Sequence, residues 1–496
     1  MKSWIDIAVI GAYLAGTTLF GCSFFFRKGS GDARTFMAGG GRLPGWAIAL
    51  SVFATYVSSI SFLAIPAKAY LTNWNALVLS FSIPFAAIAA AKWFVPFCRR
   101  SGSVSAYSFL EERFGFWARA YASGCFLVMQ SVRSGMILFL LAILLKSILG
   151  LSVPAVILVV GVSTMAYSMM GGLQAVVWID AVQAIVLIGG ALLCLLVLGC
   201  TLPGGFVSGV SGAFEAGKVS FGSFSFSDWS VETFWVTFAY GIFLNLQNFG
   251  IDQTYTQRYV AAKTEREAVR SMMGGALLYV PVSFVFIAIG TLLWIWVKSS
   301  PGVVPADVLA KSDAVFPWFI VNRLPPGVSG LLVAAIIAAA MSTVSFTLNS
   351  GATVVMEDWF RRYLRKNASD GACVAVLRLS TLFLGLVSIG VALLVIGVES
   401  ALSTWWMLQS VLSGGMLGLF LLGCMSKKVS SVQAAVATVF GMATVAWVVF
   451  FQRTFHANLS IVFGTAVLLA VGMLPITKSN EEDPVESRIS AEGEPD

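Results

Sequence analysis

Five polar side chains interrupt a strongly apolar stretch of the chain, residues 331–350, LLVAAIIAAAMSTVSFTLNS. They are Ser342, Thr343, Ser345, Thr347 and Asn349, and a sixth polar residue, Ser350, ends the stretch. Ser342, Ser345 and Asn349 are spaced three and four residues apart, so in a helix they share one face. Uncharged oxygens on one face suit a bare hard cation, because such ions prefer oxygen ligands. The alternative is helix packing, with each hydroxyl bonded to a carbonyl one turn back.

A second apolar stretch, residues 50–70, contains a run of hydroxyl side chains followed by Pro66. The run comprises Thr55, Tyr56, Ser58, Ser59 and Ser61. Small hydroxyl residues compete for the backbone hydrogen bonds of a helix, so we expect the helix to unwind here. Unwound backbone at membrane depth exposes carbonyls, which must line a cavity or bind an ion. An ordinary kinked helix is the alternative.

Two charged residues fall inside apolar stretches. Arg133 lies deep within QSVRSGMILFLLAILL. A charge at that depth costs about 2.5–3.5 kcal/mol or more and marks a functional site by default. A guanidinium at this depth can bind the carboxylate of a ligand through two hydrogen bonds. The alternative is that Arg133 forms an ion pair with an acidic residue of the protein itself. Asp180 lies near the start of another apolar stretch, so it is either interfacial or, facing residues 342–345, a carboxylate for a cation or a coupling proton.

The elements that must position these residues are membrane helices. The chain has 496 residues, 58% hydrophobic and 11% charged, a composition that excludes an ordinary soluble domain. Apolar segments of membrane-spanning length predict an all-α polytopic protein with about thirteen transmembrane helices. The segments are 4–26, 44–71, 76–98, 116–148, 152–170, 175–200, 233–257, 272–298, 327–352, 372–397, 401–425, 430–450 and 458–476. We expect one transmembrane domain over residues 1–476.

Lys and Arg cluster in alternate loops, around residues 27–42, 99–119, 258–270, 361–366 and 427–428. With thirteen spans all these clusters lie on one side, so the positive-inside rule puts the N-terminus outside and the C-terminus in the cytoplasm. The net charge of +7 then reflects cytoplasmic loops and not binding to nucleic acid. The polar, acidic segment 477–496 is predicted to be a disordered cytoplasmic tail.

The sequence lacks the residue constellations of common enzymes. His456 is the only histidine and lies in a predicted loop, which excludes a His-dependent catalytic site or a histidine metal cluster. The seven cysteines lie mostly in apolar stretches without metal-ligand spacing. No nucleophile–base pair or carboxylate pair is apparent, so we expect no enzymatic activity.

Five motifs are distinctive as a set: GGGRLPGW (39–46), SVFATYVSSISFLAIPAKAY (51–70), GGLQAVVWIDAVQ (171–183), DQTYTQRYVAAK (252–263) and AAIIAAAMSTVSFTLNS (334–350). Together they resemble the sodium/solute symporter family, and within it the bacterial sialic acid/sodium symporters. The resemblance implies a LeuT-like fold, with two inverted five-helix repeats over residues 44–425. It adds one helix at 4–26 and two C-terminal helices within 430–476. It also makes 233–257 the inverted counterpart of 44–71, with its own polar interruption at Asn245, Gln247, Asn248 and Gly250.

The resemblance further implies a sodium site between two helices. Its five ligands would be the backbone carbonyls of Ala54, Val57 and Ala339 and the hydroxyls of Ser342 and Thr343. Converging carbonyl dipoles bind Na⁺ without a fixed charge.

A second sodium site in the sialic acid members corresponds to Asp180, Ser342 and Ser345. The next position in that pattern is serine, whereas this chain has Phe346, whose ring offers no oxygen ligand. We therefore expect one coupled Na⁺ and leave the second open.

The implied substrate site is partly retained. Arg133 matches the arginine that holds the substrate carboxylate, and Ser58, Ser59 and Ser61 match hydroxyl positions of the first broken helix. The chain departs from the pattern at Tyr56, where threonine is usual, and at Ser80, where glutamine is usual. We expect a small anionic substrate, with sialic acid as the leading candidate and another acidic sugar, a small carboxylate or a neutral sugar as alternatives.

These features predict a Na⁺-coupled symporter that works by alternating access in a bacterial inner membrane, functional as a monomer. A passive pore is the first competing class, but it would need continuous polar faces, whereas the polar residues here cluster at mid-depth. A membrane sensor domain is the second, but the short acidic tail leaves no room for a signalling module.

Overall fold

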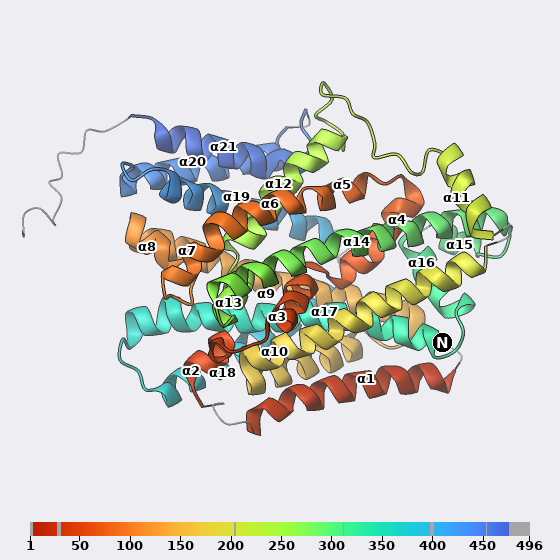
Figure 1. Cartoon of the computed structure of the whole chain (residues 1–496), viewed down its shortest axis with the longest axis horizontal. Helices are drawn as coiled ribbons and strands as arrows, with labels where there is room; N and C mark the ends of the chain where they lie inside the picture. Colours follow the sequence, from red (N-terminus) through yellow and green to blue (C-terminus); the bar gives the residue numbers. More distant parts are fainter. Residues whose placement is uncertain are drawn as a thin grey trace, which may run out of the picture.

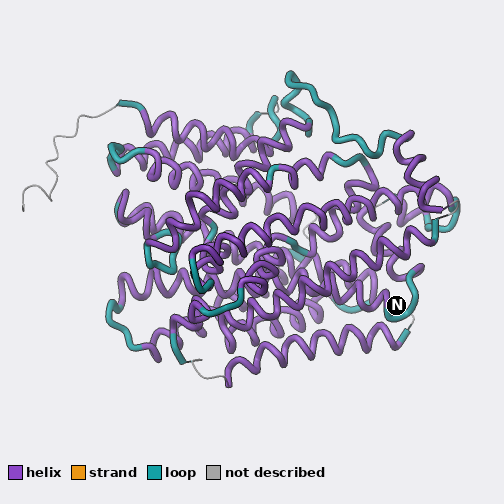
Figure 2. Tube along the Cα trace, viewed as in Figure 1, coloured by secondary structure: helices purple, strands orange, loops and turns teal. Residues whose placement is uncertain are grey.

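The computed structural model describes residues 3–26, 31–202, 205–310, 312–396, 401–452 and 454–475. Within these ranges helices joined by loops make up the chain, and Figure 2 shows no strand. One isolated bridge pairs Leu43 with Ala262. Helices suit a bilayer because each satisfies its own backbone donors and acceptors. The predicted all-α class is therefore confirmed, while the predicted tail 477–496 lies outside the described residues.

Every predicted span coincides with helical residues. In chain order these helices are α1 (Trp4–Cys22), α3 (Gly45–Tyr56), α4 (Ser59–Leu71), α5 (Asn75–Phe81), α6 (Ile83–Ala89), α7 (Val95–Arg100), α9 (Phe116–Leu149), α10 (Val153–Cys200), α12 (Phe234–Ile251), α13 (Gln253–Ala261), α14 (Glu265–Ser299), α17 (Val328–Val354), α18 (Asp370–Leu394), α19 (Ala401–Met425), α20 (Ser431–Phe450) and α21 (Ser460–Met473). A π-helical segment, η4 (Val355–Leu364), extends α17. Among the described residues, eight helices are long and apolar enough to cross a membrane, and one bent pair makes a ninth. The count of thirteen stays a prediction.

The helix α10 joins two predicted spans, 152–170 and 175–200, that we expected to be separate. Its helical geometry breaks only at Gly172, where φ is 55° and ψ is −153°. A Cβ at Gly172 would lie 2.8 Å from the carbonyl oxygen of Phe36. Only glycine tolerates both this backbone conformation and this approach, so the break is encoded at one residue.

The helix α17 forms the centre of the bundle (Figure 1). Its residues are buried almost without exception from Ser329 to Val354, and it contacts α1, α3, α9, α10 and α18. Small residues such as Ala338, Ala339 and Ala340 permit this close packing. The polar side chains of α17 are therefore enclosed by protein and do not face lipid.

Two helices are broken. α3 and α4 are bent by 54° at Val57 and Ser58, whose backbones are extended. The Ser58 hydroxyl accepts a hydrogen bond from the Ser61 amide and so caps α4. This confirms the predicted unwinding. The second break separates α12 from α13 at Asp252, so the prediction of an interruption at residues 245–250 was wrong: that stretch is continuous helix.

The two ends of the bundle differ in charge. Figure 1 places α2 (Ala33–Ala38), α7, α8 (Ser108–Phe114) and the turn before α18 at one end, with the N-terminus, α11 (Gly205–Glu215) and α15 (Ala306–Leu309) at the other. The described residues of the predicted basic clusters lie at the first end, as a common cytoplasmic side requires. Arg258 is an exception, since it is 1% exposed inside the bundle. Its assignment to a basic loop was wrong.

Candidate functional site

The break between α3 and α4 lies against the polar part of α17. The Ser342 hydroxyl donates a hydrogen bond of 3.0 Å to the carbonyl oxygen of Ala54, in the last turn of α3. The Thr343 hydroxyl lies 3.0 Å from the carbonyl oxygen of Ala339, one turn back on α17. Val57 follows in the extended break, where its carbonyl is free of the helical pattern. One contact, from Ser342 to Ala54, thus joins the two helices that carry the residues of the predicted sodium site.

Several hydroxyls of α17 follow the packing alternative instead. Thr343, Thr347, Ser350 and Thr353 each donate to a carbonyl three or four residues back, and Ser345 donates to the carbonyl of Ser342. Such bonds satisfy a hydroxyl within its own helix. Ser342 differs from them because it donates to a carbonyl of α3, so it is the hydroxyl of this stretch that joins α17 to the broken helix.

Asp180 is fully buried on α10, which excludes the interfacial alternative. Its Oδ2 accepts a hydrogen bond of 2.6 Å from the Ser51 hydroxyl and forms an ion pair of 2.8 Å with Arg258. Arg258 also donates to the Ser51 hydroxyl and to the carbonyl of Thr254. The guanidinium thus supplies a positive charge beside Asp180, where a second cation would otherwise bind.

Phe346 lies between two guanidinium groups. Its ring centroid is 5.5 Å from Cζ of Arg133 and 5.7 Å from Cζ of Arg258, both within the range of cation–π contact. The aromatic ring therefore lies beside Arg133 and beside Arg258, the ion-pair partner of Asp180. Neither the ring nor the guanidiniums can ligate Na⁺, which disfavours a second sodium site formed with Asp180 and Ser345.

Arg133 is half-buried on α9 and has no carboxylate within ion-pair distance among the described residues. Asp252 lies near enough to interact with Arg133 electrostatically, but the two side chains do not form a close ion pair. The Arg133 guanidinium can therefore donate hydrogen bonds to another group, while the ring of Phe346 makes a cation–π contact with it. A substrate carboxylate is the chemical group that such a fork fits best.

The serines of the broken helix divide into two kinds. Ser58 and Ser61 contact each other, with their hydroxyl oxygens 3.2 Å apart, and Ser58 caps α4. Ser59 is 2% exposed, and its hydroxyl has no hydrogen-bond partner. A buried hydroxyl without a hydrogen-bond partner destabilises the fold unless a ligand or a water molecule bonds to it. Of the three serines, Ser59 is therefore the best candidate for a hydrogen bond to the substrate.

Tyr56 and Ser80 lie toward α12. The Tyr56 hydroxyl donates to Oδ1 of Asn245, and its ring stacks 5.8 Å from Phe249 and lies 4.4 Å from Tyr279. Ser80 is buried on α5, which packs against α12. The structure therefore groups Tyr56 with the second broken helix, and no hydrogen bond joins Arg133 to Ser58, Ser59 or Ser61, all of which are described.

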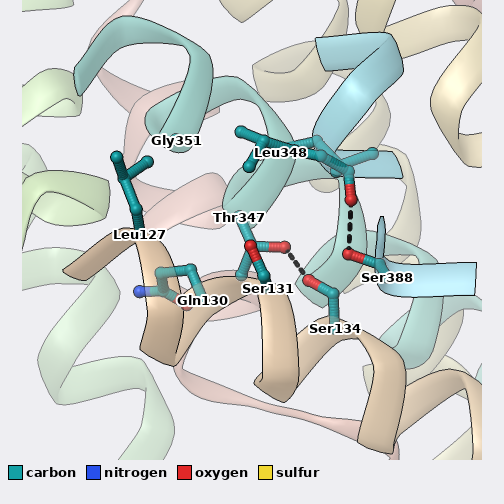
Figure 3. Close-up of a pocket in the computed structure, with 9 residues that line it drawn as sticks. Leu127, Gln130, Ser131, Ser134, Thr347, Leu348, Gly351 and Ser388 are labelled. Carbon is teal, nitrogen blue, oxygen red and sulfur yellow. Dashed lines mark hydrogen bonds between the residues drawn. The ribbon is translucent and has the colours of Figure 1, made fainter. Parts of the chain in front are cut away.

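A polar contact joins α9 to α17 one residue beyond Arg133. The hydroxyls of Ser134 and Thr347 are hydrogen-bonded, as Figure 3 shows. They line a cavity of about 10 Å³ together with Gln130 and Ser131. Oε1 of Gln130 is buried without a partner. This contact fixes α9, and with it Arg133, against the central helix.

The sequence missed two buried residues of this region. Arg258 was assigned to a loop, and Gln257 was not singled out, although its amide donates to Asn349, Thr353 and the carbonyl of Met37. One signal was available for Arg258: a buried Asp180 requires a cation, and DQTYTQRYVAAK offers one.

Comparisons with known proteins agree with this architecture. The model of the sodium:solute symporter family matches residues 36–444. The sodium/sialic acid symporter SiaT of Proteus mirabilis is 31% identical over 447 residues, which cover 89% of each chain. The sodium/sialic acid symporter NanT of Aliivibrio fischeri is 31% identical over 485 residues, which cover 96% of this chain and 94% of the relative.

A solved structure is also similar over most of its length. It is a substrate-bound, outward-open state of a Na⁺-coupled sialic acid symporter, with a TM-score of 0.89 at 29% identity, and the match covers 95% of this chain and 97% of that one. The predicted LeuT-like fold is thereby confirmed. The individual sodium and substrate residues stay predictions.

Proposed function

Because the chain belongs to the sodium:solute symporter family, we propose that it imports sialic acid, or a closely related acidic sugar, in symport with Na⁺. The similar proteins are symporters, so the expectation of a transporter and not an enzyme is confirmed. One observation carries the proposal: the Ser342 hydroxyl lies 3.0 Å from the Ala54 carbonyl, at a broken helix inside the bundle.

Na⁺ would bind where these two oxygens meet, with the carbonyls of Val57 and Ala339 and the Thr343 hydroxyl as further ligands. Such a site supports the coupling because it lies between two helices that alternating access moves relative to each other. Bound Na⁺ would hold α3 and α4 against α17 and so complete the substrate site, in which Arg133 binds the carboxylate and Ser59 a polar group.

We propose a stoichiometry of one Na⁺ for each substrate anion. The Arg258–Asp180 ion pair and the ring of Phe346 argue against a second ion. One cation and one monoanion cross together without net charge, so the membrane potential, about 2.3 kcal/mol for each charge at 100 mV, would not drive uptake. The sodium concentration gradient would supply the free energy.

The chain is a multi-pass membrane protein, and we place it in a bacterial inner membrane as a monomer. The end with the basic clusters and the C-terminus would face the cytoplasm, and the N-terminus the outside. Cysteine accessibility at the two ends of the bundle would test this orientation.

Uptake into proteoliposomes tests the function. The panel comprises a sialic acid, a uronate, a small monocarboxylate and a neutral sugar, each with and without an inward Na⁺ gradient. We expect Na⁺-dependent uptake of the acidic sugars. Arg133→Ala should abolish it, whereas Lys146→Ala, which removes an exposed cation of the same helix, should not. Equal uptake without Na⁺ would refute the coupling to Na⁺. Normal uptake by Arg133→Ala would refute the role of Arg133 in binding the substrate carboxylate.

A small carboxylate is the second candidate substrate. Tyr56 has a larger side chain than the threonine of the pattern, and its ring packs against Phe249 and Tyr279 beside the broken helix. A smaller site would favour a smaller anion. The same panel distinguishes the two, because the monocarboxylate would then be taken up faster than the acidic sugars.

A further inference from the structure

An apolar groove lies outside the site described above, between α9 and α18. Its volume is about 680 Å³, and η4 contributes to one wall. Its lining includes Leu127, Val128, Val355, Val376, Phe383 and Val391. Among the described residues no charged side chain lines it, and the only hydroxyls are those of Ser131 and Ser380. The groove therefore offers an environment for hydrocarbon.

A close contact explains why the groove exists. A Cβ at Gly135 of α9 would lie 2.6 Å from Cγ1 of Val391 and 2.8 Å from the carbonyl oxygen of Ser388. The two helices therefore touch at Gly135, where one of them has no side chain. About two turns earlier on α9, Leu127 lines the groove together with Val376, which lies about four turns before Val391 on α18, so the helices diverge from this contact toward η4. The space is a wedge that opens along the helices.

The dimensions suit an extended chain. From Val376 to Val391 the α18 wall rises by about 22 Å, at 1.5 Å per residue. This is of the order of one leaflet of a hydrocarbon core about 30 Å thick. Leu379 and Phe383 are 64% and 65% exposed, so the groove opens to the surface of the bundle, where the bilayer would surround it. One acyl chain would fill it lengthwise.

Two positive charges follow η4 in the chain, beyond the end of the groove that Val355 and Val376 line. Arg365 and Lys366 form part of the turn that links η4 to α18, at the end of the bundle that carries α2 and α8 (Figure 1). Both are exposed, and neither has a carboxylate partner among the described residues. In contrast, the nearby Arg361 and Arg362 pair with Glu357 and Glu111.

We propose that this groove binds one anionic phospholipid, with an acyl chain between α9 and α18 and the phosphate at Arg365 and Lys366. The lipid is independent of the proposed transport substrate. The groove shares Leu127, Ser131 and Leu384 with the small polar cavity beside Thr347 (Figure 3). Its occupant would consequently support the segment of α9 that precedes Arg133.

Native mass spectrometry of the delipidated full-length chain tests the proposal. The probes are a phosphatidylglycerol and a phosphatidylcholine with the same acyl chains. We expect one phosphatidylglycerol to be retained at concentrations at which phosphatidylcholine is not. Near an anionic surface each cation contributes about fivefold in affinity, so the double variant Arg365→Gln/Lys366→Gln should bind about 25-fold more weakly.

Matched variants make the result decisive. Lys427→Gln/Lys428→Gln removes two other exposed cations of the predicted cytoplasmic side and should leave binding unchanged. Val387→Trp would fill the groove and reduce retention at least tenfold, whereas Leu386→Trp, on the exposed neighbour that does not line it, would not. Equal binding of the two lipids, equal losses in the two cation variants, or normal binding by Val387→Trp would each overturn the proposal. Thermal unfolding of each variant verifies that it is folded.

Discussion

The ion pair between Asp180 and Arg258 allows the sharpest test of the reasoning. The side chains are 0% and 1% exposed, and their charged atoms lie 2.8 Å apart. Removing one partner of such a pair leaves an uncompensated buried charge and costs about 3–5 kcal/mol. We expect Asp180→Asn to lower the free energy of unfolding by an amount in the lower part of this range, because Arg258 keeps its hydrogen bonds to Ser51 and Thr254.

The assay is the free energy of unfolding in mixed micelles, measured by circular dichroism for Asp180→Asn, Arg258→Gln and the double variant. The double variant has two neutral amides in place of the ion pair. Its loss of unfolding free energy should therefore be smaller, by at least about 2 kcal/mol, than the sum of the losses in the two single variants. Glu357→Gln breaks the partly exposed pair with Arg361 and serves as the control, with an expected loss below about 1 kcal/mol.

Two results would refute this interpretation. Strictly additive losses would show that the two charges do not interact. A normal unfolding free energy in Asp180→Asn, together with a fall of the sodium Hill coefficient from two to one, would show that Asp180 ligates a second Na⁺. Our expectation is a Hill coefficient of one in the wild type and in any folded variant.

Three further changes have defined outcomes. Thr343→Ala removes a proposed sodium ligand, so the Na⁺ concentration for half-maximal uptake should rise about tenfold; an unchanged value would remove Thr343 from the site. Gly172→Ala brings a Cβ within 2.8 Å of the Phe36 carbonyl at a φ of 55°, so thermal unfolding should show a loss of about 1–3 kcal/mol, and normal stability would contradict the contact. Hydrogen bonding to Arg362 lowers the pKa of Glu111 below its ordinary 4.5, so this carboxylate stabilises the fold above that pH and loses its contribution as the pH falls through the lowered pKa. Glu111→Gln should therefore flatten the acid side of the pH–stability profile, and a profile as steep as that of the wild type would be the contrary result.

Much of the architecture could be predicted from the sequence because it depends on local chemistry. Apolar segments of spanning length are readable as membrane helices whatever they pack against. The hydroxyl run that ends at Ser61 weakens its own helix, and the unwinding at Val57 and Ser58 followed from that alone. The polar face around Ser342 was likewise visible from helical spacing.

The partners of these residues were decided only by the tertiary structure. Arg258 is 78 positions from Asp180, and the same arginine would have suited a cytoplasmic loop, so charge patterning placed it wrongly. The second break lies at Asp252 and not among the amides before it, because Asn245 and Gln247 are accommodated within helix. Composition and spacing determined that the chain is a bundle of membrane helices with one opened near its polar centre. Which oxygen faces which cation depends on contacts between distant segments, and those exist only once the helices have packed.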